Sequence, residues 1–257
     1  MMAPEGAGSY LAFAEALTHR VSTAIRAAQR RGFNSHIKPD GSVVTDVDQE
    51  IERVMRRAIL RRYPEHSILG EEWPPVNGNG YCWILDPIDG TDNFVSGIPT
   101  FGSLLSLYRA DEPVVATLSH PQLHLEYSAA RGAGVFVNGK RLQRRSPDTP
   151  SPIVVTNAPE NFARHGGLAR LTRIQEICPN TRIYRDCFAH SRVLVGAAVA
   201  GVDANVQRWD IAATRLLIEE AGGDFVEYGR WTSPAGIVYY TVVFGDPDWV
   251  ERLCRML

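Results

Sequence analysis

The chain has 257 residues, of which 44% are hydrophobic and 22% are charged, and its formal net charge at pH 7 is −2. Such a length can bury a sizeable core, and such a composition is ordinary for a globular protein. The slightly acidic balance excludes the broad positive field that is typical of nucleic-acid-binding proteins and of proteins on anionic membranes.

The cysteine pattern and the hydropathy bound the location of the protein. The four cysteines are scattered and form no Cys-x-x-Cys pair, which indicates reduced thiols rather than a disulfide framework or a zinc site. No apolar run reaches the ~20 residues that span a bilayer, and the N-terminus lacks a signal-like core. We therefore expect a cytoplasmic protein with neither a membrane nor a nucleic-acid partner.

The first predicted elements are two helices with a polar segment between them. Apolar residues recur at helical spacing over residues 8–31. The segment 34–42, which contains Lys38, is predicted to be either a lid or a plain surface loop. A second helix follows residues 43–46, with Thr45 or Asp46 as its N-cap. Asp48 lies in its first turn, where a carboxylate also has a structural reading as a complement to the helix dipole.

Two adjacent glutamates follow a short predicted strand over residues 67–70. These are Glu71 and Glu72. Because neighbouring residues of a strand face opposite ways, only one of the two is expected to point into a site.

Residues 83–94 form the central motif of the chain. The apolar strand Trp83-Ile84-Leu85 runs into Asp86 and Asp89, and Pro87 is predicted to stop the strand pairing. Gly90 permits a positive φ, and the amides that follow it would open a short helix suited to a phosphate group. Carboxylates beside such a cradle would repel a phosphate unless cations lay between them, and hard oxygen ligands favour Mg²⁺. The alternative is an Asp-rich turn that caps a helix.

The rest of the chain predicts a meander followed by alternating elements. Residues 101–142 predict an antiparallel meander with strands at 102–108, 114–119, 123–129 and 134–137. The proline-rich segment 144–152 is predicted to link an N-terminal part, residues 1–145, to a C-terminal part, residues 152–257. Alternation in the second part predicts α/β layering. Its predicted strands are 153–156, 181–184, 203–206, 224–226 and 237–243, and its helices are near 161–177 and 187–200, at 211–221 with Asp210 as N-cap, and from 246.

Three motifs resemble signatures of the inositol monophosphatase family of Mg²⁺-dependent, lithium-sensitive phosphatases. Residues 86–94, Asp-Pro-Ile-Asp-Gly-Thr-Asp-Asn-Phe, are similar to its central signature. Residues 63–72 resemble its Gly-Glu-Glu box, and residues 209–223 its Trp-Asp box. The resemblance runs from about residue 8 to the C-terminus. It implies an α/β (α+β) fold, a layered αβαβα sandwich of the sugar-phosphatase type, and a homodimeric phosphoric monoester hydrolase.

The resemblance also implies a set of metal ligands. One Mg²⁺ would be held by Glu71, Asp86 and the main-chain carbonyl of Ile88, and a second by Asp86, Asp89 and Asp210. A third, weaker ion is expected near Glu71. The N-terminal part would thus carry most of the ligands, and the C-terminal part would supply Asp210 and the substrate pocket.

The matching residues have implied catalytic roles as well. Thr91, oriented by Asp48, would activate a water molecule for in-line attack, with Glu71 as a further catalytic residue. The amides of Gly90 and Thr91 would hold the phosphate group. Lys38 matches the upstream part of the family pattern and is expected near the substrate.

The substrate alcohol is the least determined part of the prediction. Residues 202–210 form a segment about four residues shorter than in inositol-phosphate enzymes and lack the Glu that holds ring hydroxyls there. Residues 182–188 resemble the Arg-x-Tyr-x-Asp-x-Phe of histidinol-phosphatase members. We therefore expect L-histidinol phosphate as first candidate, with Asp92 and Asp186 near its amine. Inositol-1-phosphate, or a specialised sugar, aminocyclitol or nucleotide phosphate, is the alternative.

Two other classes of protein are less consistent with the motif. Haloacid-dehalogenase phosphatases carry their second Asp at +2, whereas Asp89 stands at +3 from Asp86, behind Pro87. A non-catalytic binding module would not need every carboxylate that the metal ions require, and all of them are present.

Overall fold

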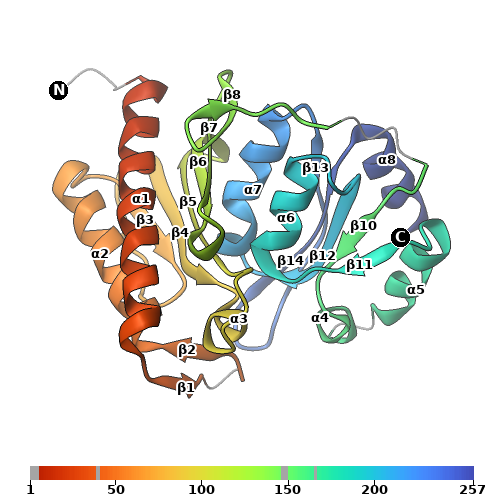
Figure 1. Ribbon diagram of the computed structural model, residues 1–257, viewed down its shortest axis with the longest axis horizontal. Helices are drawn as coiled ribbons and strands as arrows, with labels where there is room; N and C mark the ends of the chain where they lie inside the picture. The colour runs from red at the N-terminus through yellow and green to blue at the C-terminus, as the bar shows by residue number, and fades with distance from the viewer. Residues whose placement is uncertain (1–5, 39–40, 146–149, 165–166) are drawn as a thin grey trace.

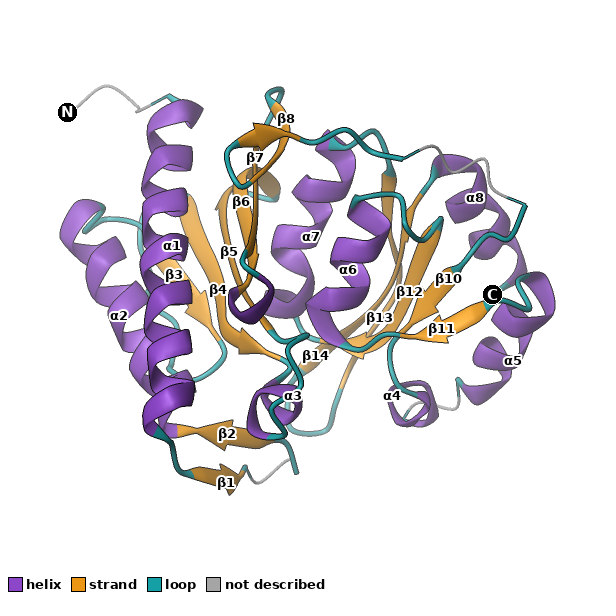
Figure 2. Ribbon diagram, in the orientation of Figure 1, coloured by secondary structure: helices purple, strands orange, loops and turns teal. Residues whose placement is uncertain are grey.

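The computed structural model describes residues 6–38, 41–145, 150–164 and 167–257. Within them the chain forms alternating layers of helix and sheet (Figure 1, Figure 2). The helices are α1 Ala7–Arg31, α2 Asp46–Arg62, α3 Thr91–Val95, α4 Pro159–Ala163, α5 Leu168–Ile177, α6 Asp186–Leu194, α7 Arg208–Glu220 and α8 Pro247–Met256. Among these helices, none combines the length and the hydropathy needed to cross a bilayer.

Two large sheets separate the helical layers. The first has the strand order β3-β4-β5-β6-β7-β8-β9, and the second β11-β10-β12-β14-β13. A small hairpin pairs β1 Ser35–Ile37 with β2 Val43–Thr45. The other strands are β3 Ser67–Gly70, β4 Tyr81–Asp89, β5 Gly102–Arg109, β6 Glu112–His120, β7 Leu125–Ala130, β8 Gly134–Val137, β9 Lys140–Arg141, β10 Val154–Thr156, β11 Thr181–Ile183, β12 Ala200–Val206, β13 Asp224–Thr232 and β14 Val238–Gly245.

Three hydrophobic cores hold the five layers together. The first lies between α1, α2 and the first sheet, with Ile25, Met55 and Trp83 fully buried. The second fills the space between the two sheets, where α6 and α7 lie (Figure 1). The third lies between the second sheet and the outer helices α4, α5 and α8. The predicted layered αβαβα sandwich is confirmed.

The division into two parts at the proline-rich segment stays a prediction. Residues 146–149 of the predicted linker lie outside the described residues. Helix α7 belongs to the second part by sequence, yet it packs on β4 to β8 of the first sheet as well as on β13 and β14 of the second.

The central strand differs from its prediction in a way that matters for the site. Pairing does not stop at Pro87, because β4 continues to Asp89 and pairs antiparallel with β5. Asp86 pairs with Leu104 and Asp89 with Gly102, so three steps on β4 match two steps on β5. The extra residue is a β-bulge, which is where a sheet accepts a proline. The bulge also converts the odd spacing of the two aspartates into an even one, so that both can face the same side.

Other departures concern element ends. The polar segment 34–42 contains β1, whose residues are all exposed and so give no apolar alternation. The helix expected over 187–200 ends at Leu194, because Gly196 turns the chain with a φ of 72° and a Cβ there would lie 2.4 Å from the Arg145 carbonyl oxygen. The helix expected over 161–177 is two helices, α4 and α5, with Gly167 as the N-cap of α5.

Candidate active site

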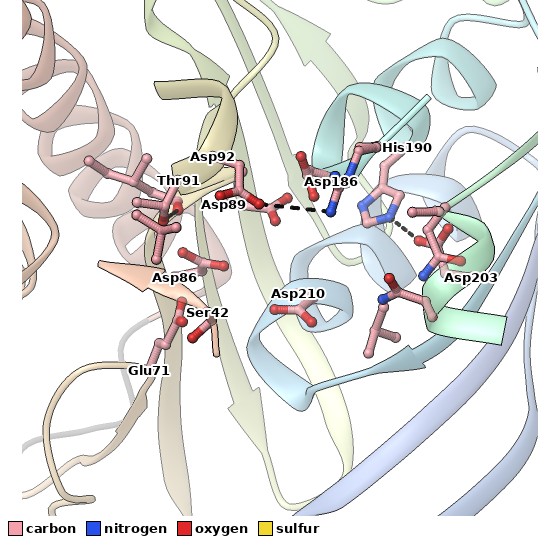
Figure 3. Close-up of a pocket in the computed structure, with 18 residues that line it drawn as sticks. Ser42, Glu71, Asp86, Asp89, Thr91, Asp92, Asp186, His190, Asp203 and Asp210 are labelled. Carbon is pink, nitrogen blue, oxygen red and sulfur yellow. Dashed lines mark hydrogen bonds and ion pairs between the residues drawn. The ribbon is translucent and has the colours of Figure 1, made fainter. Parts of the chain in front are cut away.

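A cavity of about 180 Å³ opens where β4 gives way to α3, facing the first turns of α6 and α7 (Figure 3). In this view Glu71 and Asp86 lie on one side, Asp186, His190 and Asp203 on the other, and Asp210 between them. The structure therefore brings together residues that are more than a hundred positions apart in the sequence.

Asp86, Asp89 and Asp210 form the centre of the cavity. One carboxylate oxygen from each lies within 4.8 Å of the corresponding oxygens of the other two. Asp86 and Asp89 come from the bulged end of β4. Asp210 lies at the third position of α7 rather than at the predicted N-cap, which is Gln207, and its Oδ2 accepts the main-chain N–H of Gln207 at 2.7 Å. The helix start thus orients Asp210 while leaving its other oxygen for the cavity.

The chemistry of this group fits a divalent cation. Burial, and then repulsion from the neighbouring carboxylates, raises the pKa of both Asp86 and Asp210 well above its ordinary value. The same holds for the pKa of Asp89, beside Asp186 and Asp210. The buried Oδ1 of Asp86 has no hydrogen-bond partner among the described residues. Clustered carboxylates without a cation of their own are a suitable ligand set for Mg²⁺.

A pH-dependent response to Mg²⁺ follows from these pKa values. Burial raises the pKa of Glu71 to about 7 and that of Asp186 to about 6. The metal-free folded state therefore holds protons that the unfolded chain has already lost, and its stability should fall as the pH rises from ~4.5 to ~7. Mg²⁺ replaces those protons, so millimolar Mg²⁺ should raise the Tm by about 5 °C at pH 8 and hardly at all at pH 5. Thermal unfolding at both pH values, with and without Mg²⁺, checks this. An equal shift at the two would contradict it.

Glu71 reaches the cavity because of the parallel pairing of β3 and β4. Gly70 pairs with Leu85, so Glu71 lies beside Asp86. The alternation argument for Glu71 and Glu72 is wrong, because both residues follow the end of β3 and both accept a hydrogen bond from Lys38 Nζ, at 2.8 and 2.7 Å. Glu71 lines the cavity. Glu72 is held back by its main-chain N–H, which donates to the buried carboxylate of Glu52.

Substitution of the two glutamates tests this difference. Glu71→Gln should lower kcat/KM by at least about 100-fold, because it removes a charged oxygen from the cavity wall, and Glu72→Gln by about 10-fold or less. Both replacements keep an oxygen that can accept from Lys38. Steady-state kinetics with matched unfolding curves would measure the two effects. Equal losses in folded proteins would refute the assignment of Glu71 to the cavity.

A hydrogen-bonded pair flanks the carboxylate group, as the sequence predicted. Thr91 Oγ1 donates to Asp48 Oδ1 at 2.9 Å. The second oxygen of Asp48 accepts from the main-chain N–H and from the hydroxyl of Thr45, the N-cap of α2. Burial raises the pKa of Asp48. The capping box therefore fixes a buried, more basic carboxylate behind the Thr91 hydroxyl.

The turn between β4 and α3 requires glycine. Gly90 has a φ of 86° and is the N-cap of α3. A Cβ at this position would lie 2.7 Å from Asp186 Oδ2. The main chain of Gly90 and Thr91 thus approaches the cavity as closely as a glycine allows.

The residues predicted near the substrate lie at the other end of the cavity. Asp186 accepts a hydrogen bond from Asn93 at 3.1 Å and lines the cavity, rather than facing solvent. Asp92 lines the same cavity but is exposed, and the exposed Arg185 lies 3.9 Å from it and 3.6 Å from Glu160.

Sequence reasoning missed several residues of the site. His190 and Asp203 line the cavity as a buried pair, and Asn157 and Asn161 lie beside them. Their only signal was polarity within predicted core elements, at positions where apolar residues are the rule. Glu52, which holds both Arg56 and the main chain of Glu72, carried no signal beyond a position on a helix.

The layered fold and its carboxylate-lined cavity are those of the Mg²⁺-dependent class of α/β phosphatases. The chain belongs to the inositol monophosphatase family, whose model, described as "Inositol monophosphatase family", matches residues 8–239. Members of this family are Mg²⁺-dependent phosphoric monoester hydrolases that act on small phosphate monoesters, and so is this chain.

Named relatives and solved structures agree with the family. A histidinol-phosphatase of Mycobacterium tuberculosis is 34% identical over 206 residues, which cover 77% of this chain and 79% of the relative. An inositol-1-monophosphatase of Rhizobium meliloti is 32% identical over 193 residues, 73% of each chain. The structure of the Thermotoga maritima IMPase TM1415 has a TM-score of 0.81 at 25% identity, covering 96% of this chain and 97% of that one.

Proposed function

We propose that this phosphatase hydrolyses the phosphate ester of a small amine-bearing alcohol, with L-histidinol phosphate as first candidate, using two Mg²⁺ ions, or three, per site. The observation that carries the reaction type is the convergence of Asp86, Asp89 and Asp210 beside the Thr91–Asp48 pair. The substrate proposal rests on the acidic wall opposite them.

The metal ions would be held by Glu71, Asp86, the Ile88 carbonyl, Asp89 and Asp210. When bound, such ions neutralise phosphate oxygens and make water a stronger nucleophile at neutral pH. The three aspartates fix where the phosphate can lie, because their burial leaves no other place for a multiply charged group.

Thr91 and Asp48 would handle the proton of the attacking water. The Thr91 hydroxyl donates to Asp48, so its oxygen lone pairs are free to accept a hydrogen bond from water. A proton taken up at Thr91 Oγ1 can pass along the existing hydrogen bond to Asp48 Oδ1. The amides of Gly90 and Thr91 would bind the phosphate group at the start of α3, on the close approach that Gly90 permits.

Two observations support an amine-bearing alcohol. Asp186 is inside the cavity, where a cation would relieve its repulsion with Asp89. The segment 202–210 offers no glutamate to hold ring hydroxyls. The names of the relatives support both candidate substrates, since histidinol-phosphatases and an inositol-1-monophosphatase match at similar identity.

A comparison of two substrates tests this choice. We expect kcat/KM for L-histidinol phosphate to exceed that for inositol-1-phosphate by at least about 10-fold, and Asp186→Asn to reduce this ratio by about 10-fold. Asp92→Asn is the matched comparison and should change the ratio less, because its side chain is exposed. A preference for inositol-1-phosphate, or a ratio unaffected by Asp186→Asn, would show that the pocket is read wrongly.

We further propose a cytoplasmic homodimer. The four cysteines, all within the described residues, are free thiols, which suits a reducing compartment. The homodimer rests on the family resemblance, and light scattering of the purified protein tests it.

A further inference from the structure

A buried polar trio forms the wall of the cavity farthest from Glu71. His190 on α6 lies between Asp203 on β12 and Thr214 on α7. Its Nε2 is 2.6 Å from Asp203 Oδ2, and its Nδ1 is 2.7 Å from Thr214 Oγ1. All three residues are at most 3% exposed. Both ring nitrogens are therefore used, and the orientation of the Asp203 carboxylate is fixed from behind.

The second oxygen of Asp203 is left over. Oδ1 is buried and has no hydrogen-bond partner within the part of the chain that the structure describes. Asp203 also stands where β12 shifts register against β14, between residues 203 and 206. Bulges next to active sites commonly redirect a side chain. An unpaired buried carboxylate oxygen in a cavity wall points to a hydrogen-bond donor that comes from outside the chain.

The charge of the cavity favours a positively charged donor. Its described lining residues include seven carboxyl groups and, in Arg185, one guanidinium group. Arg185 already faces Asp92 and Glu160. Two Mg²⁺ ions would serve the carboxylates around Asp86, and the phosphate itself brings two negative charges. The wall formed by Asp186 and Asp203 therefore keeps a negative charge that a neutral alcohol would not compensate.

We propose that Asp203 is a specificity-determining residue, whose Oδ1 accepts a hydrogen bond from an ammonium group on the leaving alcohol. His190 and Thr214 are positioning residues that hold the carboxylate in place. This inference rests on the proposed phosphatase function and assigns the amine of its substrate to a residue that sequence reasoning did not select.

The test compares pairs of phosphate esters that differ in one group. The pairs are L-histidinol phosphate with 3-(imidazol-4-yl)propyl phosphate, and 3-aminopropyl phosphate with n-butyl phosphate. 3-Hydroxypropyl phosphate serves as the neutral donor. The measured quantity is the ratio of kcat/KM with the amine to kcat/KM without it, with Mg²⁺ present. We expect this amine ratio to be at least about 10 in the wild type for one or both pairs.

Variants of the trio then locate the effect. Asp203→Asn should lower the amine ratio by about 10-fold, whereas Asp224→Asn, the same change at an exposed residue of the same sheet, should leave it unchanged. Thr214→Val should lower the ratio in the same direction by releasing His190, and Thr214→Ser should restore it. These two variants keep the test informative if Asp203→Asn does not fold.

The outcomes separate this inference from the function on which it rests. A lower activity of Asp203→Asn on both members of a pair, at constant ratio, would mean a merely structural role and overturn the proposal. A wild-type amine ratio near 1, or a preference for 3-hydroxypropyl phosphate, would overturn it too while leaving the Mg²⁺-dependent phosphatase intact. No phosphate release from any ester would overturn the proposed function and this inference together.

Discussion

Replacing Asp89 with asparagine is expected to lower kcat/KM by at least about 1,000-fold while the protein still folds. Asn has the shape of Asp, and its carbonyl oxygen can still accept the main-chain N–H of Cys187, which now donates to Asp89 Oδ2. What disappears is one of the three charges that converge in the cavity. The expected loss lies in catalysis because the carboxylate has no apolar packing role that an amide would fail to fill.

The stability of this variant distinguishes a site residue from a structural one. Burial and repulsion raise the pKa of Asp89 well above its ordinary value, so removing its charge should leave the Tm of the metal-free protein unchanged or higher. The Tm increase on adding Mg²⁺ should shrink. Asp248→Asn, an exposed aspartate on the outer helix α8, is the matched control. Near-normal kinetics for Asp89→Asn, or a strongly lowered metal-free Tm, would remove Asp89 from the proposed ligand set.

Local chemistry made much of the site predictable. An apolar strand that ends in Asp86 and Asp89, followed by Gly90 and Thr91, indicates a carboxylate site at a strand end next to a helix start. The structure has this arrangement. Capping rules placed Thr45 and Asp48 at the start of α2, where they form a capping box. Such features depend on residues a few positions apart, which is the range over which sequence patterns are informative.

Contacts between distant segments were predictable only through the family resemblance or not at all. Asp210 lies more than a hundred residues after Asp86, and no spacing rule joins them; the Trp-Asp box did. His190 and Asp203 belong to no matched box, and the expected helix over 187–200 ran past its true end. The bulge at Pro87 was missed because proline was taken as the end of a strand, although the sheet accommodates it with one extra residue.

The fold class was easier to predict than the element ends. Helical periodicity over residues 8–31 and the meander after residue 101 are strong patterns, and α1 and β5 to β8 lie where they were expected. Helix ends depend on single turns such as the one at Gly196, whose close contact with the Arg145 backbone comes from a segment about 50 residues earlier. That contact is tertiary and leaves no local pattern.

Phosphate release before and after removal of divalent cations tests the central claim most directly. The purified protein is assayed with Mg²⁺, after exhaustive chelation, and after Mg²⁺ is restored, with L-histidinol phosphate and inositol-1-phosphate as substrates. Without cations, Asp86, Asp89 and Asp210 repel one another and the phosphate, so activity should fall to the background rate and return fully with Mg²⁺. Activity that survives chelation, in a protein shown to be free of metal, would contradict the proposed role of this carboxylate group.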